Sequence, residues 1–224
     1  MTQQDESRTG SRLRAVLQSP DASARLQAAL LAGTHPSPGQ VEVLVARCAV
    51  EPDFFVRDML TWALTRHDGP ATVDRVLLEL RSPFPQARSQ ALHTLSKIGD
   101  RRAWPEITTD LLRDAEVEVA RAAWRAAAVL VPEGQEAALA EELASQLGRG
   151  DLEVQRSLSR ALVALGDAAA PVLRRAAAST DRGRRRHALA TERLVQHPEE
   201  GFDVAVAAAE RTLALLGAPV VVDE

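Results

Sequence analysis

Aromatic residues are scarce in this chain, and tyrosine is absent altogether. Aromatic side chains make up only 3% of the 224 residues, whereas 46% are hydrophobic, with alanine and leucine dominant. Alanine and leucine are strong helix formers, and the only β-like run, Val220–Val222, is too short to build a sheet. The sequence therefore predicts an all-α protein whose core consists of small and straight-chain side chains.

Cysteine and long apolar runs are almost absent as well, and each absence excludes a class of protein. Cys48 is the only cysteine, so no internal disulfide can form and no zinc site can be built from cysteines. No segment approaches the roughly 20 apolar residues of a membrane span, and the first ten residues lack the apolar core of a signal peptide. We therefore expect a cytoplasmic protein that does not contact a membrane.

The charge balance limits the partners that can be expected. The net charge is −4, which argues against a wholly basic nucleic-acid-binding domain. Among 27 basic residues, Lys97 is the single lysine. This bias toward arginine, together with the abundance of alanine, indicates a GC-rich bacterial genome, so arginine clusters are weaker evidence of function here than in other sequences.

An internal repeat organises the chain. The first five copies have a small or β-branched residue, usually followed by arginine, with apolar residues four and eight positions later, whereas the sixth is weaker and has Glu192 at the last of these positions. Successive copies start roughly 30 to 35 residues apart, a spacing typical of short helical-hairpin repeats. The six copies start at Ala24, Val56, Ala87, Val119, Val154 and Arg184.

Start and stop signals recur in phase with this pattern. Three residues before each start lies an acidic residue, except at Phe84, and such a carboxylate can cap the first helical turn. Gly99 and Gly166 follow the last apolar residue of two copies, where a left-handed residue ends a helix. The five acidic residues are Asp21, Asp53, Glu116, Asp151 and Asp181.

An amphipathic partner segment precedes each copy, so each unit is interpreted as a hairpin of two helices. The partners span Ser11–Gln18, Gln40–Val50, Pro70–Arg81, Pro105–Arg113, Gln135–Leu147 and Ala168–Ala178. Stacked hairpins bury one continuous core that no hairpin could bury alone. We expect a flexible N-terminus over residues 1–10, a single solenoid over 11–217 that ends in a capping helix at Phe202–Leu216, and a tail over 218–224.

The pattern D-x-x-[VA]-R-x-x-x-A-x-x-x-L, followed in one copy by Ile-Gly-Asp, resembles the HEAT-repeat family, in its short form named after phycobilisome lyases. The clearest copies are Asp53–Leu64, Ala87–Asp100 and Asp151–Asp167. The resemblance implies a right-handed α-solenoid, an armadillo-like α-α superhelix, of about six HEAT-like hairpins. It also implies that the second helix of each hairpin lines the concave surface. The family serves many unrelated partners, so it implies no particular function.

Helical periodicity then predicts which side chains face the concave surface. With each copy's start as position zero, positions 0, 4 and 8 point into the core, and positions 2 and 6 point away from it. The arginines among the exposed positions suggest a basic ridge that binds an acidic protein segment, or alternatively solvated arginines paired with acids on adjacent helices. The predicted binding residues are Asp58, Trp62, His93, Arg121, Arg125, Arg156, Arg160 and Arg186.

No motif for a nucleophile, metal or cofactor occurs in the sequence, so we expect no catalytic residue, metal or cofactor. The first hypothesis is a non-catalytic, monomeric scaffold or adaptor that binds another protein, with nucleic acid as the second choice of partner. One alternative is a DNA-binding protein related to HEAT-like alkylpurine DNA glycosylases, because Asp58 and Trp62 lie one helical turn apart. A bilin-lyase-like protein is the other alternative, suggested only by the repeat subtype. The sequence leaves open whether Trp62 and Trp124 are exposed.

Overall fold

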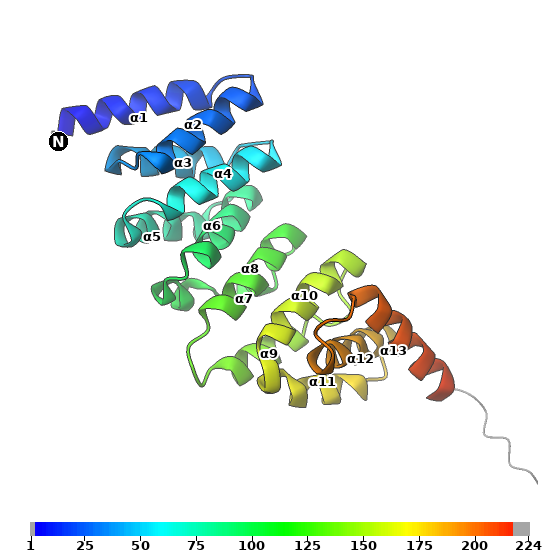
Figure 1. Cartoon of the computed structure of the whole chain (residues 1–224). Coiled ribbons are helices and arrows are strands. Elements are labelled where there is room, and N and C mark those ends of the chain that lie inside the picture. The colour runs from blue at the N-terminus through cyan, green and yellow to red at the C-terminus, as the bar shows by residue number, and fades with distance from the viewer. Residues whose placement is uncertain (1–2, 217–224) are drawn as a thin grey trace, which may run out of the picture. The chain divides into compact units, whose positions relative to one another are not determined.

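The computed structural model describes the backbone of residues 3–216 and the side chains of residues 8–216 (Figure 1). Over this range the chain forms α-helices and short 3₁₀ turns and contains no strand, which confirms the all-α prediction. None of these helices is both long enough and apolar enough to cross a membrane. The predicted tail and Val220–Val222 lie outside the described residues.

The chain divides into two compact units, Met1–Leu130 and Val131–Glu224, each of which is described by itself. The single solenoid expected over residues 11–217 therefore stays a prediction. The first unit contains α1 (Gln3–Leu17), α2 (Ala22–Thr34), α3 (Val41–Cys48), α4 (Phe54–Thr65), α5 (Gly69–Leu78), α6 (Pro85–Ile98), α7 (Thr109–Leu112) and α8 (Val117–Leu130). The second contains α9 (Glu136–Ala144), α10 (Leu152–Ala164), α11 (Ala170–Ala177), α12 (Arg182–Gln196) and α13 (Phe202–Leu216).

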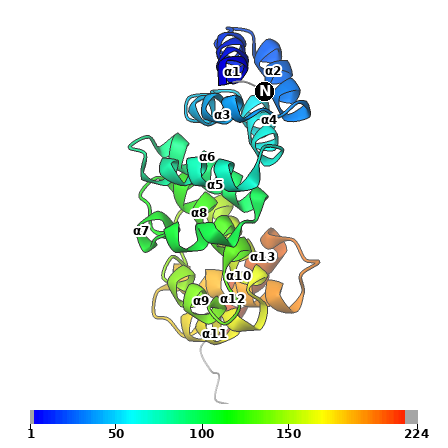
Figure 2. The same ribbon diagram turned by 90° about the vertical axis from the view of Figure 1, so that its left-hand side faces the viewer.

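The helices of the first unit form two layers. Along the chain, α1 packs on α2, α3 on α4, α5 on α6 and α7 on α8, so each sequence copy is the second helix of a hairpin. The second helices α2, α4, α6 and α8 contact one another in succession, and α1, α3 and α5 do the same in the other layer (Figures 1 and 2). The first unit is therefore a stack of helical hairpins, as the repeat predicts.

Two first helices differ from their predicted extents. α1 begins at Gln3 rather than at Ser11, so it includes most of the segment expected to be flexible. Gly10 allows α1 to approach the next hairpin closely, because a side chain at this position would collide with the carbonyl oxygen of Gly39. The helix predicted over Pro105–Arg113 is instead a 3₁₀ turn, Arg101–Glu106, followed by the four-residue α7, because the Thr108 side chain caps a new helix start.

The second unit repeats the hairpin arrangement with α9 and α10, then α11 and α12, and ends with α13 packed on α12. The contact between α12 and α13 is apolar and includes Ala190, Leu194 and Phe202, all of which are buried. Ala190 occupies position 6 of its copy, which the sequence predicts to be exposed. It is buried because α13 covers this face of α12.

Core positions and caps follow the repeat. At positions 0, 4 and 8 of α4, Val56, Leu60 and Leu64 are buried almost completely, as predicted. Gly99 ends α6 with φ 75°, a left-handed conformation that favours glycine. Four of the five predicted acidic caps accept a hydrogen bond from a backbone N–H of the first turn: Asp21, Asp53, Asp151 and Asp181.

The arginine at position 1 of the repeat has a structural role that the sequence analysis does not identify. Arg25 donates to the carbonyl oxygens of Ser19 and Pro20, in the turn before its own helix. Arg57 and Arg88 donate to carbonyl oxygens of the equivalent turns in the next two hairpins. Where glutamine replaces arginine, Gln155 still donates to the Gly150 oxygen. The residue at position 1 therefore holds the turn inside these four hairpins.

Candidate binding surfaces

Five of the predicted binding residues lie in the first unit, on the helices α4, α6 and α8. Trp62 is 38% exposed. Its ring lies over Gly33 of α2, where an added Cβ atom would fall only 2.3 Å from the indole. The glycine therefore lets α2 approach closely enough to support one side of the ring while the rest stays accessible. The exposed indole is suited to serve as a binding anchor.

Asp58, His93 and Arg125 lie in a row across three adjacent helices. Arg125 Nη1 donates to His93 Nδ1 at 3.1 Å, and His93 Nε2 lies 3.9 Å from Asp58 Oδ1. A guanidinium only donates, so Nδ1 is the acceptor and the ring proton of the neutral imidazole is on Nε2, on the Asp58 side. Burial, followed by the charge of Arg125, lowers the pKa of His93. His93 therefore positions Arg125 without neutralising its charge.

Arg125 and Arg121 differ in their ion pairs. Arg125 is exposed, and among the described side chains no carboxylate forms an ion pair with it. Arg121, one turn earlier on α8, donates to Glu118 at 2.8 Å. Arg125 is therefore the cation of this face that is available to a carboxylate from outside.

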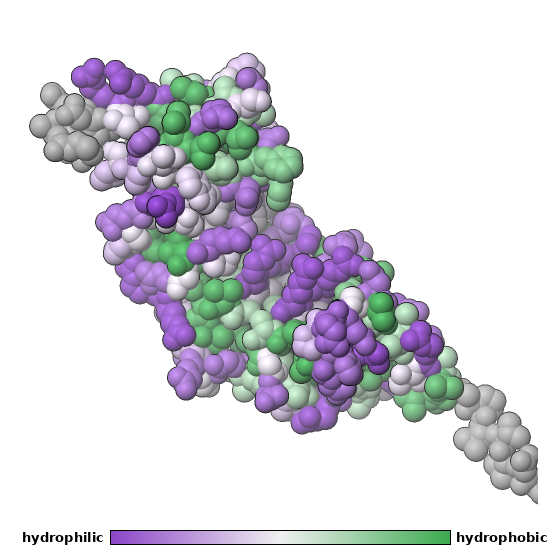
Figure 3. All heavy atoms as spheres, viewed as in Figure 1, coloured by the Kyte–Doolittle hydropathy of each residue, from purple (hydrophilic) through white to green (hydrophobic). Residues whose placement is uncertain are grey.

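The remainder of this face is apolar. Leu30 of α2 is 37% exposed, close to the exposed fraction of Trp62. Figure 3 shows hydrophobic residues gathered over α2 and α4, and hydrophilic residues over α6 and α8. The face therefore changes from apolar at α2 and α4 to cationic at α8. We call it the mixed face; it comprises Leu30, Asp58, Trp62, His93 and Arg125.

Trp124, whose exposure the sequence leaves open, is not part of the surface. Its side chain is fully buried, and its indole Nε1 donates to the Leu112 carbonyl oxygen at 2.8 Å. Trp124 therefore packs α8 onto α7 and contributes nothing to an exposed surface.

The three other predicted arginines lie in the second unit, where α13 supplies carboxylates to two of them. Arg156 contacts Asp203 at 2.9 Å and Glu153 at 3.0 Å. Arg186 contacts Glu210 at 3.1 Å. Arg156 and Arg186 are therefore paired with acids on neighbouring helices, as in the alternative interpretation of the sequence. Arg160 is exposed and has no ion pair with the described residues. A single ridge of all five arginines across both units stays a prediction.

The described residues contain no group of three histidine, cysteine or acidic side chains that could hold a metal ion. Cys48 is buried, and burial, reinforced by the charge of Glu51, raises the pKa of its thiol to about 12. Such a thiol stays protonated at neutral pH and is a poor nucleophile.

His187 is a structural histidine at the centre of a buried polar cluster. Its Nδ1 accepts from the Gly148 N–H at 3.1 Å, and its Nε2 donates to the Gln155 carbonyl oxygen at 3.0 Å. The Ser159 hydroxyl, also 3.0 Å from Nε2, contacts Thr191 at 2.7 Å. Burial lowers the pKa of His187 to about 4, against 6.5 for a free histidine.

This shift predicts that acid destabilises the second unit. The unfolded chain binds a proton at His187 below about pH 6.5, whereas the folded chain does so only near pH 4. The stabilisation is therefore complete above pH 6.5 and is lost as the pH falls from 6.5 toward 4. We expect His187→Gln to flatten this part of the pH profile, measured as hydrogen exchange of α12 amides. An unchanged slope would contradict the assignment, and His35→Gln, at an exposed histidine, serves as control.

No protein-family model matches this chain, and no curated protein matches it in sequence. Among solved structures, it is similar to a crystal structure described as that of an engineered protein, with 22% identity, a TM-score of 0.46, and coverage of 88% of this chain and 98% of that chain. It is also similar to the complex of CpcE and CpcF of phycocyanin lyase from Nostoc sp., with 20% identity, a TM-score of 0.38, and coverage of 91% and 94%. Neither similarity assigns a function to this chain.

Proposed function

We propose that this protein is a non-catalytic adaptor, a right-handed HEAT-like superhelix that binds a segment of another protein on the mixed face of its first unit. The segment places an apolar side chain against Trp62 and an acidic side chain against Arg125. The observation that carries the proposal is the combination of a partly exposed indole with a cation that no carboxylate among the described side chains neutralises.

The two ends of the mixed face supply different parts of the binding free energy. A tryptophan that is buried on binding contributes a large apolar area, and such residues dominate many interfaces. Arginine binds carboxylates through two parallel hydrogen bonds, which fixes the orientation of the partner. The hydrogen bond to His93 holds the Arg125 guanidinium near this geometry before binding, which lowers the entropic cost of association.

The test is to identify the partner by capture from the native host and then to measure its affinity for the purified chain by calorimetry. We expect Trp62→Ala and Arg125→Glu each to weaken binding by roughly 30-fold or more, the loss of about 2 kcal/mol typical of a central interface residue. The matched control is Arg12→Glu, at an exposed arginine of α1 without an ion pair among the described side chains. Affinity should also fall with added salt, because exposed charges are screened beyond about 8–10 Å at physiological ionic strength.

Two outcomes would overturn this proposal. Equal affinity of Arg125→Glu and Arg12→Glu for the partner would remove the mixed face from the interaction. Release of alkylated bases from treated DNA, abolished by Asp58→Asn, would instead establish the glycosylase alternative. Asp58 is well exposed, and His93 is the only group with which it forms a contact within 4.0 Å among the described charged side chains.

A further inference from the structure

The second unit contains a cavity whose lining shares no residue with the mixed face. This cavity of about 510 Å³ opens between α10, the end of α12 and the start of α13. This volume is within the range of small-molecule sites, which run from about 300 to 1,000 Å³. Its lining includes Arg156, Arg160, Val163, Leu194, Phe202 and Asp203.

The charges around this cavity are balanced except at one residue. Asp203 forms an ion pair with Arg156, and Arg193 donates two hydrogen bonds of 2.6 Å to Glu200. Arg160 is the exception, because it lines the cavity without a carboxylate partner among the described residues. The cavity therefore presents one guanidinium whose five N–H donors are not matched by an anion.

The rest of the lining is largely apolar. Val163 and Leu194 come from α10 and α12, and Phe202 packs beneath the guanidinium of Arg156, 5.9 Å from its ring centroid. The first turn of the 15-residue α13 also borders the cavity, and the start of a helix favours a negative charge. The lining thus combines an apolar wall with a cationic end.

We propose that this cavity binds a small organic acid, with its carboxylate on Arg160 and its apolar body against Val163, Leu194 and Phe202. A carboxylate supplies the missing partner of Arg160 and accepts two hydrogen bonds from the planar guanidinium. A phosphate ester would meet the same cation, but its second negative charge would lie close to Glu200 and Asp203, which disfavour it. Binding here involves only the second unit and does not depend on the partner proposed for the mixed face.

The experiment uses the full chain, with 4-phenylbutyrate as the acid and 4-phenylbutanamide as its uncharged counterpart of the same shape. Binding is followed by amide NMR shifts at the start of α13. We expect the acid to bind at least about tenfold more tightly than the amide, because hydrogen bonds between charged groups are the stronger ones. Arg160→Gln should remove this difference. Arg174→Gln, at an exposed arginine of α11 without an ion pair among the described residues, should leave it unchanged.

A third variant moves the affinity in the opposite direction, which loss of folding could not do. Asp203→Asn removes a carboxylate that lines the cavity and leaves Arg156 with Glu153 as its one ion-pair partner among the described residues. The acid should then bind severalfold more tightly. Equal affinity for the acid and the amide, or weaker binding of the acid to Asp203→Asn, would overturn the proposal whatever the outcome for the partner of the first unit.

Discussion

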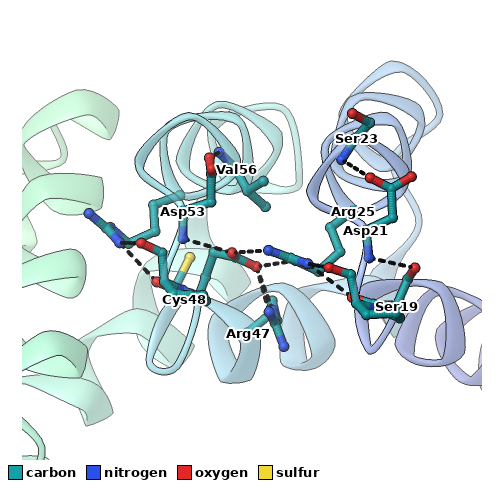
Figure 4. Close-up of polar contacts among 12 residues, drawn as sticks. Ser19, Asp21, Ser23, Arg25, Arg47, Cys48, Asp53 and Val56 are labelled. Atoms are coloured by element: carbon teal, nitrogen blue, oxygen red, sulfur yellow. Dashed lines mark hydrogen bonds and ion pairs between the residues drawn. The ribbon is translucent and has the colours of Figure 1, made fainter.

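Replacing Glu51 with alanine is expected to lower the free energy of unfolding of the first unit by about 3–5 kcal/mol, the usual cost of breaking a buried ion pair from one side. The Glu51 side chain is fully buried, and it receives two hydrogen bonds of 2.8 Å from Arg25 (Figure 4). Arg47 and the Asp53 N–H donate to the same carboxylate. Alanine would leave the Arg25 guanidinium buried without its counter-ion.

The position of Glu51 explains why the effect should reach beyond one helix. Arg25 belongs to α2, Arg47 to α3, and Asp53 is the N-cap of α4. A single carboxylate thus joins three helices of two successive hairpins. A matched control is Glu42→Ala, which removes an exposed carboxylate that pairs with Arg75. Surface ion pairs contribute about 0–1 kcal/mol, so this variant should differ little from the parent chain in a denaturant titration.

The same contacts predict an acid-dependent loss of stability. Burial raises the pKa of Glu51, but the hydrogen bonds from Arg25, Asp53 N–H and Arg47 together outweigh it, so the net pKa is lowered from its ordinary value of 4.5. The stabilisation is complete above about pH 4.5 and is lost as the pH falls through the lower folded-state value. Glu51→Ala should therefore lose less stability below pH 4.5 than the parent chain does. Equal losses in both would show that Glu51 does not carry the acid dependence.

The repeated features of the fold are predictable from the sequence because they depend on local physics. The apolar period places Leu60 and Leu64 in the core, and the capping chemistry of Asp53 and Asp151 needs only the next few residues. The departures depend on contacts between distant segments. Only the position of Gly39 shows why a glycine is needed at residue 10 of α1, and only the position of α13 shows why Ala190 is buried.

The same distinction holds for the binding residues. Helical periodicity places Asp58, Trp62 and Arg125 on one exposed face of the first unit, because positions 2 and 6 recur in each second helix. Periodicity does not show which charges are already neutralised. Arg156 and Arg186 occupy position 2 of the repeat and Arg160 occupies position 6, and both positions are predicted to be exposed. The carboxylates that pair with Arg156 and Arg186 come from α13, 47 and 24 residues further along the chain. The repeat pattern alone does not show that carboxylates of α13 lie beside Arg156 and Arg186.

The second large effect concerns the apolar core. Leu95 in α6 and Leu162 in α10 both occupy position 8 of the repeat, and both side chains are fully buried. Replacing either with alanine removes apolar contacts and leaves a cavity that a stack of rigid helices closes only in part. We expect each replacement to lower the free energy of unfolding by about 2–5 kcal/mol.

The two replacements should act on different parts of the chain, since Leu95 belongs to the first unit and Leu162 to the second. Denaturant titration gives the size of each loss, and hydrogen exchange should show it in α6 for Leu95→Ala and in α10 for Leu162→Ala. Exposed leucines provide controls in the same units: Leu78 in α5 is 62% exposed and Leu152 in α10 is 43% exposed. Replacing these with alanine should cost far less, because little apolar area returns to water. A loss below about 0.5 kcal/mol for Leu95→Ala or Leu162→Ala, the range of ordinary surface substitutions, would mean that position 8 does not face the core and that the helical phase of the whole repeat is wrong.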